Sequence, residues 1–183
     1  MRSWRSGTYR PTVLRRFGIA GIALVVSTLV LRVPLSSALI SRGDDMLYQG
    51  DTARALSFYR RALTFNSQDE VAADRFAFVS MTLHRPTNLR EAIAVATRFL
   101  NVAPSDSVLR MDRALCEWRL RNDRAAESDF GMVGVQRNDP RALVFAGYAA
   151  LRDGKGADAR RWWRAALGIR ARYVPALRAL VAQ

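Results

Sequence analysis

The sequence is poor in the residue types that most catalytic and metal sites require. It contains one histidine, His84, and one cysteine, Cys116, so it cannot build a zinc site from several such ligands or form an intrachain disulfide. No glycine-rich phosphate loop follows a strand-like stretch, and no useful length of sequence alternates apolar and polar residues. We therefore predict an all-α protein that is not an enzyme, with no cofactor, no metal and no small-molecule substrate.

The few groups that could carry chemistry have more ordinary interpretations. Cys116 lies in a helical pattern, which favours a small buried apolar side chain over a reactive thiol. The adjacent carboxylates of Asp44 and Asp45 could bind a metal or transfer protons, but such a pair more often belongs to a solvated helix face.

Acidic residues are scarce at the N-terminus. The chain has 29 basic and 16 acidic residues, a net charge of +13, and Lys155 is the only lysine. No acid precedes Asp44, and residues 1–35 contain six arginines: Arg2, Arg5, Arg10, Arg15, Arg16 and Arg32. Subtracting these six charges from +13 leaves +7, so nearly half of the net charge belongs to the N-terminal segment and favours anionic lipid headgroups over nucleic acid.

A membrane-targeting arrangement occupies residues 1–35. A basic segment, residues 1–16, precedes an uncharged run from Phe17 to Leu31, and positive charge stays on the cytoplasmic side. The run is shorter than the roughly 20 residues of a membrane span, but it could extend to Ile40 if Arg32 reaches the interface. We predict that residues 17–35 form an uncleaved single-pass anchor, with the N-terminus in the cytoplasm and the rest in the bacterial periplasm or cell exterior. The alternatives are a signal peptide cleaved near Ala38, which would release a secreted protein, and a buried helix.

A helix–turn–helix pattern repeats after this segment. Gly50 can end one helix, Asp51 can cap the next, and Ala55, Tyr59 and Ala62 then share a helix face. The first of these alanines recurs at spacings of 37, 34 and 33 residues, as Ala92, Ala126 and Ala159. Twelve residues before each of the four stands a small residue, as a close helix crossing requires: Gly43, Ser80, Ala114 and Gly147.

These features resemble the tetratricopeptide repeat (TPR), a helix–turn–helix of about 34 residues. The resemblance covers residues 36–183 and implies a TPR-like α-solenoid of about four helix pairs with a C-terminal capping helix. We expect Leu177, Leu180 and Val181 of that last helix to cover the end of the stack. We also expect Ser67 and Glu70 to form a capping box.

The third copy departs from the pattern. Arg110 and Glu117 stand where apolar residues are expected, which suggests that its first helix is shifted in register.

TPR proteins line a concave groove with their first helices, and the resemblance implies where that groove lies here. The candidate residues hold equivalent positions near the ends of the four first helices: Tyr48, Met81, His84, Arg85, Leu115, Trp118, Arg119, Tyr148 and Arg152. Arginines beside apolar and aromatic side chains suit an acidic partner segment with hydrophobic anchors. The alternative is that the arginines only stabilise helix C-termini.

A second candidate surface contains Arg160 and Trp162. Trp162 is flanked by arginines and is either a contact hot spot or a half-buried helix residue.

The leading functional hypothesis is a membrane-anchored protein–protein interaction scaffold or adaptor. It would bind a partner segment in its concave groove, in envelope, secretion, pilus or membrane-complex assembly. The first alternative is an accessory structural subunit of a larger membrane complex. The second is a nucleic-acid binder, which the predicted topology disfavours.

Overall fold

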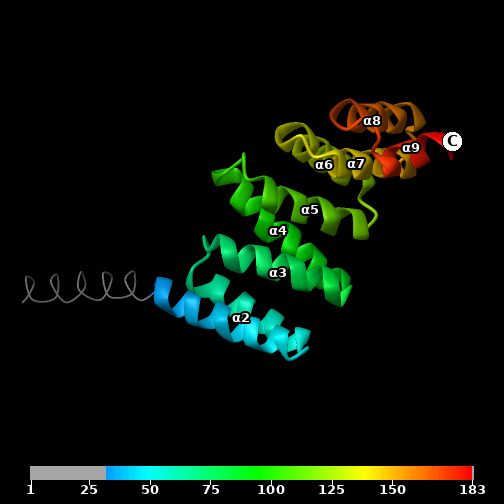
Figure 1. The fold of residues 1–183 in the computed structure, drawn as a ribbon. Helices are drawn as coiled ribbons and strands as arrows, with labels where there is room; N and C mark the ends of the chain where they lie inside the picture. The colour runs from blue at the N-terminus through cyan, green and yellow to red at the C-terminus, as the bar shows by residue number, and fades with distance from the viewer. Residues whose placement is uncertain (1–31, 183) are drawn as a thin grey trace, which may run out of the picture.

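The computed structural model describes residues 32–182, and all regular structure in that range is helical (Figure 1). Helical residues 32–48 precede eight further helices: α2 (Thr52–Phe65), α3 (Glu70–Leu83), α4 (Pro86–Val102), α5 (Ser107–Arg119), α6 (Asp123–Arg137), α7 (Pro140–Arg152), α8 (Gly156–Ile169) and α9 (Val174–Val181). From α2 onward each helix packs against the next. The predicted solenoid is confirmed, and its first described residues and its C-terminus lie at opposite ends (Figure 1).

The predicted membrane segment lies mostly outside the described residues. Residues 1–31 fall outside them, and residues 32–35 belong to the first helix of the solenoid. Between residues 32 and 182, no helix combines the length and the apolar character that a membrane crossing needs.

Aspartate caps the start of four of the eight helices α2–α9, at Asp51, Asp69, Asp106 and Asp139. Asp51 accepts a backbone hydrogen bond from Arg54 at 2.9 Å, as its position after Gly50 predicts. The predicted capping box at Ser67 is wrong: α3 begins at Glu70, and Asp69 caps it by accepting from the backbone nitrogen of Ala72 at 3.1 Å.

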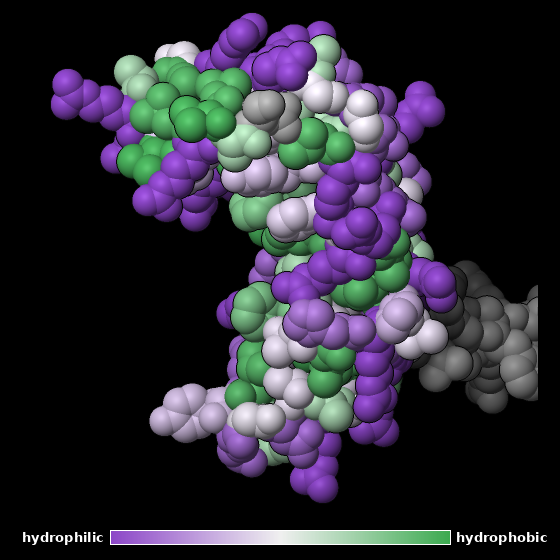
Figure 2. All heavy atoms as spheres, turned by 90° about the vertical axis from the view of Figure 1, so that its right-hand side faces the viewer, coloured by the Kyte–Doolittle hydropathy of each residue, from purple (hydrophilic) through white to green (hydrophobic). Residues whose placement is uncertain are grey.

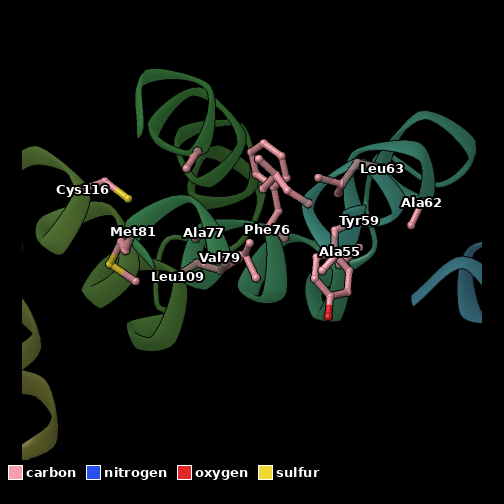
Figure 3. Close-up of a cluster of buried hydrophobic side chains, with 14 of the residues drawn as sticks. Ala55, Tyr59, Ala62, Leu63, Phe76, Ala77, Val79, Met81, Leu109 and Cys116 are labelled. Carbon is pink, nitrogen blue, oxygen red and sulfur yellow. The ribbon is translucent and has the colours of Figure 1, made fainter. Parts of the chain in front are cut away.

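Large aromatic side chains fill the space that small residues leave at the helix crossings. Tyr59 and Trp163 are both fully buried. A Cβ added at Gly43 would lie 2.5 Å from Cε1 of Tyr59, and one added at Gly147 would lie 2.6 Å from Cδ1 of Trp163. Figure 3 shows Tyr59 among the apolar residues of the first core cluster, with its hydroxyl directed outward. That hydroxyl donates to Asp44 at 2.6 Å, so the aromatic ring is buried without an unsatisfied polar group.

The third repeat keeps its register, so the predicted shift is wrong. Ala114 is fully buried at the helix crossing, like its equivalents in the other repeats. Arg110 is only 8% exposed, because Asp129 of α6 accepts from its Nη1 at 3.3 Å. Arg113 adds two shorter bonds to the same carboxylate, at 2.7 and 2.8 Å. A buried ion pair therefore replaces the apolar contact that the repeat pattern predicts.

The last helix packs through a different face from the predicted one. Ala176 and Ala179 are buried, and the small alanines bring α9 close to α8. Leu177 is 42% exposed and Val181 87% exposed, so the prediction that they cover the end of the stack is wrong. Only Leu180, which is half-buried against the same core, fits it.

Candidate partner-binding surface

The predicted groove follows the first helices of the repeats, which are residues 32–48, α3, α5 and α7. α3 contacts α5 directly, whereas within residues 32–182 no comparable contact joins the second helices α4 and α6. Trp118 of α5 packs against Phe145 of α7, so these two first helices meet through side chains. The predicted groove residues come from the C-terminal halves of these helices, except for His84, which is the C-cap of α3, and Arg85, which is the N-cap of α4.

Arg119 and His84 join the ends of α5 and α3. Nη1 of Arg119 donates to the backbone carbonyl of Met81 at 3.1 Å and also contacts Nε2 of His84. His84 ends α3 in the left-handed conformation, and its Nδ1 lies 2.7 Å from the carbonyl of Thr82. Both side chains are exposed but already contribute to the seam between two repeats.

Arg152 makes the equivalent connection one repeat later. Its Nη2 donates to the carbonyl of Trp118 at 2.8 Å, its Nε donates to Asp123 at 2.8 Å, and its guanidinium lies 5.0 Å from the centre of the Trp118 ring. The Trp118 ring in turn packs edge-on against Phe145 and Phe130, with centroids 5.1 and 6.2 Å apart. Arg119 and Arg152 thus each bond a carbonyl in the last turn of the preceding first helix, which favours the helix-terminus interpretation for these two arginines.

The other groove candidates divide into covered and accessible residues. Met81 is buried, Leu115 is half-buried in the core, and Tyr148 packs edge-on against Trp163 at 5.5 Å between centroids. Tyr48 is 96% exposed, and Arg85, at the equivalent site of the next repeat, is also exposed. Neither side chain makes a hydrogen bond or an ion pair to the rest of the described chain.

The second candidate surface is only partly accessible. Nε1 of Trp162 donates to Glu127 at 3.0 Å, and its ring fills the space above Gly131, where a Cβ would lie 2.7 Å from Cη2. Trp162 therefore fits the half-buried interpretation, while Arg160 beside it is exposed.

Helix α5 contains two buried ionisable groups, Asp112 and Cys116. Burial and the neighbouring carboxyl of Asp74 raise the pKa of Asp112 to about 8, and Oδ2 of Asp112 has no hydrogen-bond partner in the part of the chain that the structure describes. Burial also raises the pKa of the Cys116 thiol to about 12. The sequence pattern did not identify Asp112 as a buried residue, because a single carboxylate in a helical pattern is usually exposed to solvent.

A hollow of about 250 Å³ that the sequence reading missed lies at one edge of the solenoid. It is bounded by the C-terminal end of α4 and by the caps of α3 and α5, and its apolar wall consists of Phe99, Val102 and Ala103. Val102 is 75% exposed. Its position two residues before Pro104 places an apolar side chain at a helix end, and this was the feature of the sequence that could have indicated the hollow.

The architecture matches solved TPR structures at low sequence identity. A crystal structure of MamA has a TM-score of 0.70 and 14% identity, with 80% of this chain and 79% of that chain covered. A tetratricopeptide repeat protein from Parabacteroides merdae has a TM-score of 0.66 and 17% identity, with 80% of this chain and 58% of that chain covered. The structure of pilF from Pseudomonas aeruginosa has a TM-score of 0.59 and 18% identity, with 81% of this chain and 74% of that chain covered. No protein-family model matches the chain, and no curated protein matches it by sequence. At these identities the likeness shows a shared TPR solenoid fold.

Proposed function

We propose that the chain is a protein–protein interaction scaffold that binds a partner segment along the inner side of its first helices. The observation that carries this proposal is the exposure of Tyr48 and Arg85 at equivalent sites of two successive repeats, where Arg119 and Arg152 instead join helices. Tyrosine and arginine, together with tryptophan, are enriched among the hot spots of protein interfaces.

The accessible residues also indicate the partner's chemistry. An arginine that no carboxylate of the described chain engages can form a bidentate bond with a carboxylate of another protein. Tyr48 offers a flat apolar ring one repeat away. An acidic segment with a hydrophobic anchor, the partner that the sequence predicts, would fit Arg85 and Tyr48. The proposed binding surface therefore covers the first two repeats instead of all four.

Site-specific photo-crosslinking in cells tests this proposal. A photoreactive residue at position 48 or 85 should give the same protein adduct, whereas one at Arg61 or Arg90, exposed residues of the second helices, should not. With the adduct identified, Arg85→Glu should weaken its binding tenfold or more, about 1.4 kcal/mol, and the matched Arg90→Glu should not. Equal adducts from both sets of positions would contradict the proposal.

We also propose that the scaffold is not an enzyme. A cysteine acts as a nucleophile through its thiolate, and a pKa of about 12 keeps Cys116 protonated near neutral pH. His84 contributes to the junction between α3 and α5, 2.7 Å from a backbone carbonyl.

Finally, we propose that residues 17–35 anchor the chain in a membrane, with the repeats outside the cytoplasm. The support is the basic segment followed by an apolar run, together with Ser36. This buried residue donates to Asp69 at 2.7 Å and would be lost if a signal peptidase cut near Ala38. A reporter that is active only in the periplasm, fused after Gln183, should be active, and inactivity of a stably produced fusion would contradict this orientation.

A further inference from the structure

The outer face of α9 carries a row of exposed apolar side chains. Val174, Leu177 and Val181 stand at the spacing i, i+3, i+7, which aligns them on one helix face, and they are 51, 42 and 87% exposed. Ile169, at the end of α8, is 39% exposed. Figure 2 shows apolar side chains gathered at this end of the solenoid, with hydrophilic side chains projecting around them.

The charged residues of the same region are all positive. Residues 159–182 contain six arginines and no acidic residue. Arg161 pairs with Asp158 at 3.3 Å, but the other five form no ion pair within residues 32–182. Arg170, Arg172 and Arg178 lie on α9 or in the loop that leads to it, beside the apolar row.

A further repeat helix does not fit this face well. Leu177 and Val181 follow Leu143 and Gly147 by 34 residues, so α9 presents the face that α8 covers on α7. At the crossing, Gly147 leaves room for the ring of Trp163, whereas Val181 brings a branched side chain to that place. A deformable apolar phase tolerates such a shape better than a close-packed helix does.

We propose that this C-terminal patch, formed by Ile169, Val174, Leu177 and Val181 with Arg170, Arg172 and Arg178, binds the surface of an anionic lipid bilayer. The arginines match the phosphate-rich headgroups, and the apolar row enters the boundary with the acyl chains. The contact orients the solenoid on a membrane and is independent of both the partner-binding surface and any N-terminal anchor.

A local probe on the full-length chain tests this inference. Ala182→Cys places an environment-sensitive fluorophore next to the patch, and the buried, protonated Cys116 thiol should remain unlabelled. With vesicles containing phosphatidylglycerol the probe emission should shift to the blue and be quenched by spin-labelled lipid. Pure phosphatidylcholine vesicles should produce neither change. Because the probe reports only its own surroundings, attachment of residues 1–31 to the bilayer cannot mimic the signal.

Two sets of variants give the matched comparison. Replacing Arg170, Arg172 and Arg178 with alanine should weaken the vesicle response at least tenfold, because each arginine at an anionic surface contributes roughly a factor of five. The control replaces three exposed arginines of the second helices, Arg61, Arg90 and Arg124, with the same loss of charge and should leave the response unchanged. Leu177→Ser with Val181→Ser should also abolish the blue shift, while circular dichroism confirms an intact helix content.

Three results would overturn the inference. They are an unchanged probe on anionic vesicles, an equal response in both arginine variants, and a response that requires an added acidic protein instead of lipid. The last result would identify the patch as a protein-binding surface.

Discussion

The substitution Gly147→Ala tests the close crossing of α7 and α8. Trp163 is fully buried, and its Nε1 donates to the carbonyl of Val144 at 3.3 Å. The added Cβ would lie 2.6 Å from Cδ1 of the indole and closer still to Nε1. One extra methyl group must therefore displace the largest buried side chain of the domain or separate the two helices.

Three contributions set the size of the effect. Overpacking costs about 1–3 kcal/mol, and a buried indole N–H left without its acceptor costs about 1–3 kcal/mol. Alanine favours the helix over glycine by about 1 kcal/mol. The net expectation is a loss of stability of about 2 kcal/mol or more, which lowers the melting temperature by roughly 4–8 °C in a chain of this size.

Gly168→Ala is the matched control, because Gly168 lies in α8 and a Cβ there meets no atom within 4 Å. It gains the same helix preference without the clash and should raise stability by about 0.5–1 kcal/mol. Thermal unfolding followed by circular dichroism and tryptophan fluorescence compares the two. If Gly147→Ala is as stable as Gly168→Ala, the crossing is looser than described here and the reasoning fails.

Three further predictions concern charged groups. Arg152→Ala should cost about 1–3 kcal/mol of unfolding free energy because Asp123 loses its partner, whereas Arg85→Ala should change it by less than about 0.5 kcal/mol; urea titration distinguishes them. Asp129→Asn should cost roughly 3–5 kcal/mol, because Asp129 is 4% exposed and its loss leaves buried guanidinium charge; a melting temperature like that of the wild type would contradict this. The folded-state pKa of Asp112, about 8, exceeds its ordinary value of about 4, so between these pH values the folded state binds the extra proton, and stability should fall as pH rises from about 4 to 8 and then level off. Asp112→Asn should flatten that dependence in melting curves measured from pH 5 to 9.

The repeat architecture was predictable because it depends on local patterns. Gly50 followed by Asp51 marks a helix boundary through backbone conformation and capping, which act within a few residues. The small residues at Gly43 and Gly147 predict close crossings because only small side chains permit them. Both kinds of signal recur at one repeat length, so the position of the diverged third copy along the chain could be predicted, although its register was not.

The sequence predicted which positions the candidate arginines occupy in the repeats, but not the groups that each arginine contacts. The sequence places Arg85, Arg119 and Arg152 at equivalent sites, but it does not show which carbonyls and carboxylates lie within reach of each guanidinium. The structure gives Arg152 a partner in Asp123, on a different helix. It leaves Arg85 without an ion pair among the described residues.

The sequence by itself determined the helices, their order and the small–large alternation at their crossings, because these follow from spacing along one chain. Only the tertiary structure decided that Arg110 keeps its register by pairing with Asp129, nineteen residues away on another helix. It also decided that α9 turns its alanines inward and leaves Leu177 and Val181 exposed. A helical pattern names the faces of a helix, but the neighbour that each face meets is set by packing, and packing depends on residues distant in the sequence.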